Sequence, residues 1–347
     1  MNITHTRRNF LRSATAMMAG GIVAVGRCHA QTDETKESQT EPRFKISLAQ
    51  WSLHRALKAG EIDNLDFPSI AREKFGLDAV EWSNHFACVE NEKLGVQPKD
   101  KKYLAEVKKR TGDLGVKNLL IMCDKVGNLG DPDKTRRSNA VTGHFAWVEA
   151  AKFLGCHSLR VNAASDRTLS SKQQQDLCVE GLSKLCEFAE PMGINIIVEN
   201  HGGLSSDGSW LASVMKQVPL KNCGTLPDFG NFYVARNRGN ADRYVKDKSF
   251  FQDNPNYTED KVGLQYDRYQ GVTDLMPFAK GVSAKSHDFN DSGEEINTDY
   301  SRMLKIISDS GYSGYIGIEY EGKDTAEMKG IALTKTLLEK TFAELKA

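Results

Sequence analysis

The order of segments along the chain constrains the fold more than any other feature. Short apolar stretches alternate with longer amphipathic ones from about residue 44 to the end of the 347-residue sequence. Eight stretches have the length and bounding turns of strands, at residues 45–51, 79–83, 118–123, 158–162, 195–199, 224–228, 281–286 and 315–319. Strict alternation of strand and helix predicts a parallel sheet, and eight such units predict a closed (β/α)8 TIM barrel of the α/β class.

The helical stretches support this prediction. Residues 140–154 and 171–192 place apolar side chains every three or four positions, as one buried helix face requires. Gly155 and Gly193 follow them, where a left-handed residue commonly ends a helix. No Gly-x-Gly-x-x-Gly follows the first strand, which disfavours an open dinucleotide-binding sheet.

One connection is much longer than the others. Residues 229–272 follow the sixth strand, show no core pattern and are rich in Asn, Asp, Arg and Tyr. A loop of this length in a compact domain is usually functional or disordered. Its place after a strand puts it at the C-terminal mouth of the barrel. We therefore expect a lid or substrate-facing insertion, with an oligomer contact as the alternative.

The N-terminal residues have the pattern of an export signal. Arg7-Arg8 precedes a short run of small and apolar residues at 13–26, and a small-x-Ala cleavage site ends at Ala30. That run is too short for a membrane span, which needs about 20 residues. The expected parts are a twin-arginine signal peptide at 1–30, a flexible linker at 31–43 and a single barrel domain at 44–347. This predicts a periplasmic or otherwise exported protein without a membrane span after cleavage.

The charge balance argues against a nucleic-acid-binding surface. The sequence has 46 basic and 46 acidic residues, and the expected signal peptide holds four arginines and no acid. Without the signal, 42 basic residues face 46 acidic ones, a net charge of about −4. Nucleic-acid-binding domains usually carry a basic surplus.

Four successive strands are expected to end in a residue that can bind a metal: Glu199, Asp228, His287 and Glu319. In a barrel these strand ends meet at the C-terminal mouth, where active sites lie. Three carboxylates in one apolar place would repel one another, and a divalent cation would remove that cost. Three oxygens and one imidazole suit Mn²⁺, with Mg²⁺, Co²⁺ or Zn²⁺ as alternatives. For any single acid, the alternative is a turn former or a helix cap.

Further candidates share strand parity with these residues, because positions two apart face the same side of a strand. His201 lies two beyond Glu199 and is a candidate acid or base, or else a hydrogen-bonding histidine. Lys285 lies two before His287 and is a candidate for neutralising a negatively charged intermediate, or else an internal salt bridge. The candidate substrate contacts are Gln50, Trp51, His54, Glu81, Arg160, Asn162, Asn231 and Glu321.

Motifs around these residues resemble those of the xylose isomerase-like superfamily of sugar isomerases and epimerases. The segments that carry the resemblance are residues 197–203, 227–231, 286–288 and 318–322. The resemblance implies that the four expected ligands hold one divalent metal. It also implies that Glu199 and Glu319 act as the acid and base on opposite faces of a sugar, whose carbonyl and neighbouring hydroxyl pass through an enediolate.

Two departures leave the reaction open. Asn231 stands where the epimerases of this family often have a histidine, and residues 288–291 lack an arginine often found there. The leading hypothesis is a sugar isomerase or epimerase. The alternative is a 3-keto-glycoside lyase that eliminates the C1 substituent during glycoside breakdown outside the cytoplasm.

The sequence also bears on two other classes of protein. The superfamily also contains endonuclease IV, but that site needs many histidines and only six follow the expected signal peptide. An inert sugar-binding protein is the other alternative. The expected partners are therefore a sugar or glycoside, with a second copy of the chain as a further candidate and no nucleic acid.

Overall fold

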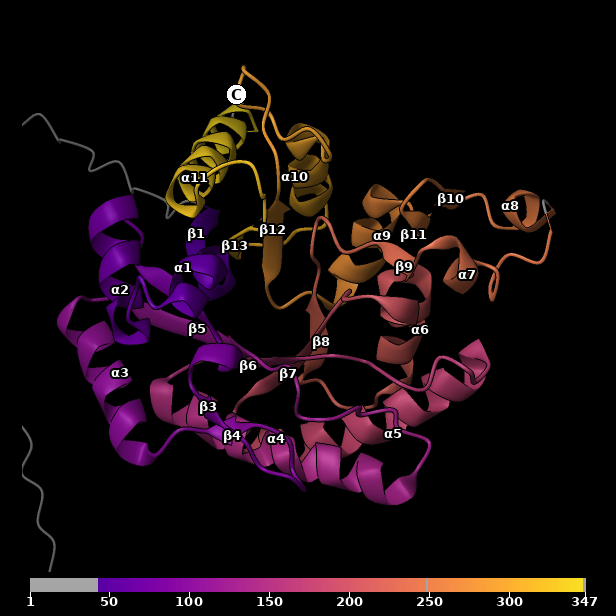
Figure 1. Cartoon of the computed structure of the whole chain (residues 1–347), viewed down its shortest axis with the longest axis horizontal. Helices are drawn as coiled ribbons and strands as arrows, with labels where there is room; N and C mark the ends of the chain where they lie inside the picture. Colours follow the sequence, from indigo (N-terminus) through magenta and orange to yellow (C-terminus); the bar gives the residue numbers. More distant parts are fainter. Residues whose placement is uncertain (1–42, 248, 346–347) are drawn as a thin grey trace, which may run out of the picture. The chain divides into compact units, whose positions relative to one another are not determined.

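The computed structural model describes residues 43–247 and 249–345. The expected signal peptide and nearly all of the expected linker lie outside these residues. Eight parallel strands form one sheet in the order β12-β13-β1-β2-β5-β6-β7-β8 (Figure 1). Their bounds are β1 (Phe44–Ala49), β2 (Ala79–Ser83), β5 (Lys117–Met122), β6 (Ser158–Val161), β7 (Asn195–Glu199), β8 (Cys223–Leu226), β12 (Val282–Ser286) and β13 (Gly314–Tyr320). The predicted barrel is confirmed, and each strand lies where the sequence placed it to within two residues.

The sheet closes through a short seam between β8 and β12. Single parallel bridges join Thr225 to Ala279 and Asp228 to Ser283. Pro227 lies between them and has no N–H to donate, so a regular ladder cannot run through this position. Its carbonyl still accepts a hydrogen bond from the Ser283 N–H at 2.9 Å. The seam therefore sets Asp228 beside β12 at the mouth of the barrel.

Helices follow the strands and cover the outside of the sheet (Figure 1). The longer ones are α3 (Lys101–Asp113), α4 (Lys134–Leu154), α5 (Ser171–Ala189), α6 (Gly208–Gln217), α9 (Arg268–Leu275), α10 (Tyr300–Asp309) and α11 (Glu327–Glu344). The short helices α1 (His54–Ala59) and α2 (Phe67–Ser69) precede β2, and a small hairpin pairs β3 (Cys88–Val89) with β4 (Gln97–Pro98). No helix in the described part of the chain has the length and apolar character that crossing a membrane requires.

Side-chain caps explain where several helices begin. Helix α4 starts six residues before the predicted position because the Asp133 carboxylate accepts the N–H of Arg136. Ser170 and Gln173 form a reciprocal capping box at the start of α5. The N-caps of α3, α6, α9 and α10 are also aspartates: Asp100, Asp207, Asp267 and Asp299.

Apolar side chains fill both sides of the sheet. A small cluster of Ala49, Leu120, Met122, Ile197 and Leu226 is buried and draws on four of the barrel strands. A much larger cluster joins the other faces of these strands to the surrounding helices. The barrel interior is therefore packed rather than open, which leaves the strand ends as the place for a site.

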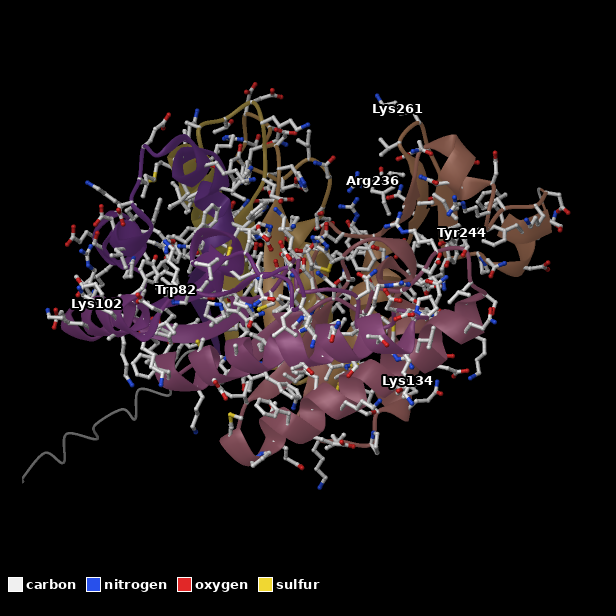
Figure 2. All side chains as sticks on the ribbon, turned by 60° about the horizontal axis from the view of Figure 1, so that its bottom comes forward. Trp82, Lys102, Lys134, Arg236, Tyr244 and Lys261 are labelled. Carbon is white, nitrogen blue, oxygen red and sulfur yellow. The ribbon has the colours of Figure 1, made fainter. Side chains whose placement is uncertain are left out.

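The long connection after β8 is structured, contrary to the expectation that it has no core. It contains β9 (Tyr233–Arg236), α7 (Arg238–Ala241), α8 (Ser249–Asp253), β10 (Tyr257–Glu259) and β11 (Gly263–Tyr266). The three strands form an antiparallel sheet over the buried residues Ala235, Ala241 and Leu264. Figure 2 shows Arg236, Tyr244 and Lys261 on this part, to one side of the barrel. Strands of three or four residues are too short to show a readable period in the sequence.

Two helical glycines differ in what surrounds them, and this yields a stability prediction. A Cβ on Gly181 in α5 would lie 2.0 Å from the backbone oxygen of Leu129. Gly181→Ala is therefore expected to lower the free energy of unfolding by about 1–3 kcal/mol through overpacking. Gly112 in α3 has nothing within 4 Å, so Gly112→Ala should raise it by about 0.5–1 kcal/mol. Urea unfolding measures both, and a stable Gly181→Ala would contradict the close contact.

Candidate active site

Three buried carboxylates meet at the C-terminal mouth of the barrel; we call them the acidic triad. Glu199 is the last residue of β7, Asp228 follows β8 after Pro227, and Glu319 is next to last in β13. One oxygen of each lies within 4.8 Å of the others, and the three residues are at most 3% exposed. Carboxylates this close and this buried require compensating positive charge.

Neighbouring donors fix two members of the triad in place. The Oδ1 atom of Asp228 accepts the N–H groups of Gly230 and Asn231, both at 2.9 Å. The side-chain amide of Asn231 then donates to Oε1 of Glu199 at 2.8 Å. Asn231, a predicted substrate contact, therefore positions the triad instead of lining the cavity beside it.

The hydroxyl of Ser283 lies between two carboxylates of the triad. Its Oγ lies 2.8 Å from Oδ2 of Asp228 and 2.7 Å from Oε2 of Glu319. A serine hydroxyl has one proton, so both contacts are good hydrogen bonds only when one carboxyl group is protonated. Burial, reinforced by the charge of Glu199, raises the pKa of Asp228 to about 6 and that of Glu319 to about 8. A divalent cation would replace this proton, and three carboxylate oxygens suit such an ion.

Lys285 brings one positive charge to the triad. Its Nζ lies 3.3 Å from Oε1 of Glu319, 3.7 Å from Oδ2 of Asp228 and 3.1 Å from Oε2 of Glu321. Burial opposes the charged amine, but these carboxylates outweigh it and hold the pKa of Lys285 well above its usual value. Glu321 also accepts a hydrogen bond from the Trp51 indole. Against the effect of burial, Lys285 and Trp51 lower the pKa of Glu321 to about 2.

His287, the fourth expected metal ligand, does not join the triad. The described ligand atoms that come together belong to Glu199, Asp228 and Glu319. Strand β12 ends at Ser286, so His287 lies past the strand, where its N–H donates to Glu295 at 3.2 Å. The strand register instead sets Lys285 directly opposite Glu319. The expected site is thus present as three carboxylates, with a lysine at the level where the sequence placed a histidine.

Arg160 joins the triad to a second acid, Asp124, which follows β5. Its Nη1 donates to Oδ1 of Asp124 at 2.9 Å. Its Nε lies 2.6 Å from Oε2 of Glu199, in an ion pair that is not aligned as a hydrogen bond. Asn162 donates to the same Asp124 oxygen at 2.7 Å. Although burial opposes it, the charge of Arg160 and these hydrogen bonds hold the pKa of Asp124 well below its usual range.

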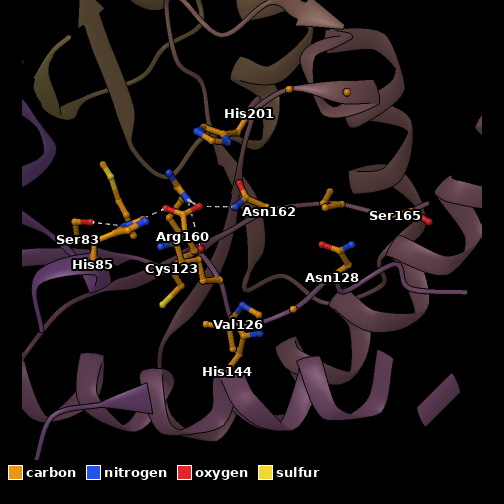
Figure 3. A pocket seen from close by; sticks show the side chains of 18 of the residues that line it. Ser83, His85, Cys123, Val126, Asn128, His144, Arg160, Asn162, Ser165 and His201 are labelled. Atoms are coloured by element: carbon orange, nitrogen blue, oxygen red, sulfur yellow. Dashed lines mark hydrogen bonds and ion pairs between the residues drawn. The ribbon is translucent and has the colours of Figure 1, made fainter. Parts of the chain in front are cut away.

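A cavity of about 710 Å³ opens beside these groups (Figure 3). Its wall near the triad includes Trp51, Arg160, Asn162, Glu319 and Glu321, and its far wall includes Asn128, Ser165, Arg167 and Gln174. The volume is typical of small-molecule sites. The buried Oδ1 of Asn162 has no hydrogen-bond partner in the described chain, so a hydroxyl group of a ligand would satisfy it.

Three histidines line the cavity, and two of them, His85 and His201, lie on different sides of Arg160 and Asn162 (Figure 3). His201 is exposed on the cavity wall, yet the surrounding groups lower its pKa by desolvation. His85 has its Nδ1 3.2 Å from Oγ of Ser83 and 3.8 Å from Oδ2 of Asp124. Burial lowers its pKa as well, although Asp124 opposes this. Both rings are therefore predominantly neutral at pH 7 and able to accept a proton.

Three of the expected substrate contacts have other roles. Gln50 is fully buried, and its Oε1 accepts the N–H of Ser83 at 3.0 Å. His54 stacks on Trp51 with ring centroids 4.9 Å apart. The first strand ends at Ala49, and the following turn directs Gln50 and His54 to packing positions. Glu81 lies deeper in the barrel and borders a separate cavity at its other end.

The buried position of Glu81 predicts a pH-dependent stability. Burial raises its pKa from 4.5 to about 7, against a hydrogen bond from Ser47. The folded state then binds more protons than the unfolded state between these values, so stability falls as pH rises from about 4.5 to 7. Ionisation of Glu81 should lower the free energy of unfolding by about 3 kcal/mol over that window. The free energy of unfolding of Glu81→Gln should fall less over the same window. Urea unfolding at pH 4.5, 6 and 8 tests this; parallel pH profiles for both proteins would contradict it.

His85 and Asp124 line the cavity but were not among the predicted site residues. Asp124 directly follows an apolar strand, which is the same pattern that identified Glu199 and Glu319. His85 lies two residues past Ser83, the end of β2. A search for strand-end polar residues on all eight strands would have found both.

The sequence matches the family described as xylose isomerase-like TIM barrel over residues 71–340. The protein belongs to this family, whose fold is that of sugar isomerases and epimerases. Its acidic triad lies at the barrel mouth, at the ends of β7 and β8 and in β13.

Solved structures with the same fold have low sequence identity. One is the IOLI protein with a bound zinc atom, at 14% identity and a TM-score of 0.61, covering 86% of this chain and 98% of that one. Another is a D-tagatose 3-epimerase-like protein, at 17% identity and a TM-score of 0.58, covering 87% and 98%. At these identities the likeness shows the shared fold alone.

A curated relative adds a different activity. The alpha subunit of 3'-dehydrocarminate deglycosidase from Microbacterium sp is 31% identical over 93 residues. The match covers 25% of this chain and 26% of that protein, so the chain spans about a quarter of this relative.

Proposed function

We propose that this protein is a divalent-metal-dependent enzyme that removes a proton next to the carbonyl group of a sugar or glycoside. The observation that carries the proposal is the buried triad of Glu199, Asp228 and Glu319, which shares the mouth of the barrel with a cavity of sugar-binding size. The leading reaction is isomerisation or epimerisation, as in the 3-epimerase-like relative of the same fold.

The proposed ion is Mn²⁺, with Mg²⁺ as the alternative, because three carboxylates with open positions for oxygen ligands suit both ions. When bound, such an ion would polarise a carbonyl oxygen as a Lewis acid. The zinc atom bound by the IOLI protein supports a cation in a site of this fold.

The protein's own residues would handle the proton and the substrate hydroxyls. Glu199 is held between Arg160 and Asn231, so its carboxylate keeps one orientation while it accepts or returns a proton. Glu319, on β13, would supply the second carboxylate that accepts or returns a proton. His201 faces the cavity in its neutral form and would exchange a proton with substrate oxygens. The unpartnered Oδ1 of Asn162 would accept a substrate hydroxyl.

A second candidate is elimination from a 3-keto-glycoside, which the carminate deglycosidase match favours. The first step would be the same, with the proton leaving C2 beside the C3 carbonyl group. The electron pair of that bond would form a C1–C2 double bond while the C1–O bond breaks. The departing oxygen would take up a proton from solvent, which neutral His201 on the cavity wall would relay. The far wall at Asn128, Ser165 and Gln174 would leave room for an aglycone.

The proposed location of this activity is outside the cytoplasm, following the Arg7-Arg8 pattern at the N-terminus. An exported enzyme would act on free sugars or glycosides instead of phosphorylated sugars. This choice of substrate agrees with both reactions above.

Solvent-proton exchange tests the proposal. The Mn²⁺-loaded protein is incubated in heavy water with ketohexoses and 3-keto-glycosides, and NMR follows deuterium and products. Deuterium next to the carbonyl without aglycone release supports an isomerase or epimerase, and a released aglycone supports a lyase. Tight sugar binding with no exchange and no product across both panels would leave a binding protein and overturn the proposal.

A further inference from the structure

Strand β12 lies between β13 and the segment that follows β8, which carry two members of the acidic triad. At the triad, β12 contributes the positively charged side chain of Lys285 instead of a metal ligand. Strands β12 and β13 pair in a register that sets Lys285 opposite Glu319. Ser283 lies two residues earlier on β12 and forms a backbone bridge with Asp228. Its hydroxyl contacts the carboxylates of Asp228 and Glu319. His287 lies two residues further on, which is about 7 Å along an extended strand. At the level of the triad, β12 therefore presents an ammonium group.

The ammonium group of Lys285 contacts three carboxylates, two that belong to the acidic triad and one that does not. Its side chain is only 2% exposed, so it has little freedom to leave the site for water. It contacts Glu319 and Asp228 of the triad at 3.3 and 3.7 Å. It also contacts Glu321, outside the triad, at 3.1 Å. Glu321 is 28% exposed and borders the cavity.

We propose that Lys285 is a tethered competitor of the divalent metal, held against the triad without metal and drawn to Glu321 when metal binds. This inference rests on the proposed function, since it concerns the same triad. An ammonium group and a divalent ion at one carboxylate cluster repel each other strongly in a buried site. Glu321 already accepts the amine, so the displaced charge keeps a partner.

Two consequences follow from this competition. The metal-free protein is folded with part of its acidic charge neutralised, unlike structural zinc sites that are unfolded without metal. Metal affinity is weaker than three carboxylates would otherwise give, so the ion exchanges readily. Both consequences concern binding, and they hold whichever sugar reaction the protein catalyses.

Titration of Mn²⁺ into metal-free protein tests the proposal, with bound ion measured by calorimetry and free ion by electron paramagnetic resonance. Lys285→Met is expected to bind Mn²⁺ at least about tenfold tighter than wild type, because the competing charge is gone. Lys280→Met is the matched control, since Lys280 borders the cavity at the other end of the barrel, and its affinity should equal that of wild type. Equal or weaker binding by Lys285→Met would overturn the proposal.

A second variant keeps the test decisive if Lys285→Met does not fold. Glu321→Gln removes the charge that receives the displaced amine, so it should weaken Mn²⁺ binding several-fold. Unchanged or tighter Mn²⁺ binding by Glu321→Gln alone would contradict the competition. Where Lys285→Met folds, adding Glu321→Gln to it should change the affinity much less. Additive effects of the two substitutions would contradict the competition.

The result separates this inference from the proposed function. If wild type and Lys285→Met bind Mn²⁺ equally, the competitor role is wrong while the metal site stands. If neither binds Mn²⁺, the competitor role and the metal in the proposed function are both wrong. Solvent-proton exchange is measured separately and tests the sugar chemistry itself.

Discussion

Glu319→Gln is expected to lower kcat/KM by about three orders of magnitude, which corresponds to about 4 kcal/mol of transition-state stabilisation. The substitution keeps the shape of the side chain but removes a charge from the triad and a group that holds a proton. It leaves Ser283 and Lys285 as neighbours of a neutral amide. Steady-state kinetics on the substrate found by proton exchange measures the effect.

The matched control for this loss is Glu339→Gln. Glu339 is exposed in α11 and pairs with Lys335, four residues earlier. Such surface pairs contribute little, so kcat/KM should be unchanged. Metal-free Glu319→Gln should also be at least as stable as wild type, because it removes a buried acid whose pKa is raised. A loss of less than tenfold in kcat/KM would mean that Glu319 has no direct part in the reaction.

Arg160→Met is expected to lower the free energy of unfolding by about 3–5 kcal/mol. Arg160 is 3% exposed and contacts both Asp124 and Glu199. Without it, two buried carboxylates lose their shared partner. Urea unfolding at pH 7 measures the change, and combining it with Asp124→Asn should recover part of the loss because one unpaired charge is then absent.

Arg167→Met is the control for this effect. Arg167 also lines the cavity but is exposed, so its replacement should change stability by less than about 0.5 kcal/mol. A loss below about 1 kcal/mol for Arg160→Met would mean that water or another cation already compensates Asp124 and Glu199.

The barrel was predictable because short, largely buried strands alternate with amphipathic helices along the chain. Residues 195–199 and 315–319 end in an acid after a largely apolar run, and both acids lie where the barrel geometry requires. The small sheet of β9, β10 and β11 was not predictable by the same reasoning. Its strands are three or four residues long, and much of its core consists of aromatic side chains that are only partly buried, such as Tyr244 and Phe250.

The choice between Lys285 and His287 lay beyond a single sequence. Alternation along a strand gives the face of a residue, and both residues share that face. It does not give the height in the barrel, which depends on the pairing of Lys285 with Glu319 across two strands. Glu81 shows the same limit, since it faces the interior but pairs with Ala49 in a lower layer.

The expected role of the long connection as a lid or an oligomer contact stays a prediction. Its apolar cluster gives it a core of its own around Leu264. We therefore expect the long connection to behave as one folded unit in either role.

The most direct test of this account is anomalous diffraction at the manganese edge from crystals grown with Mn²⁺. A metal site at the acidic triad predicts one peak at about 2–2.3 Å from carboxylate oxygens of Glu199, Asp228 and Glu319 together. No peak at these three residues, or a peak coordinated by other side chains, would contradict it.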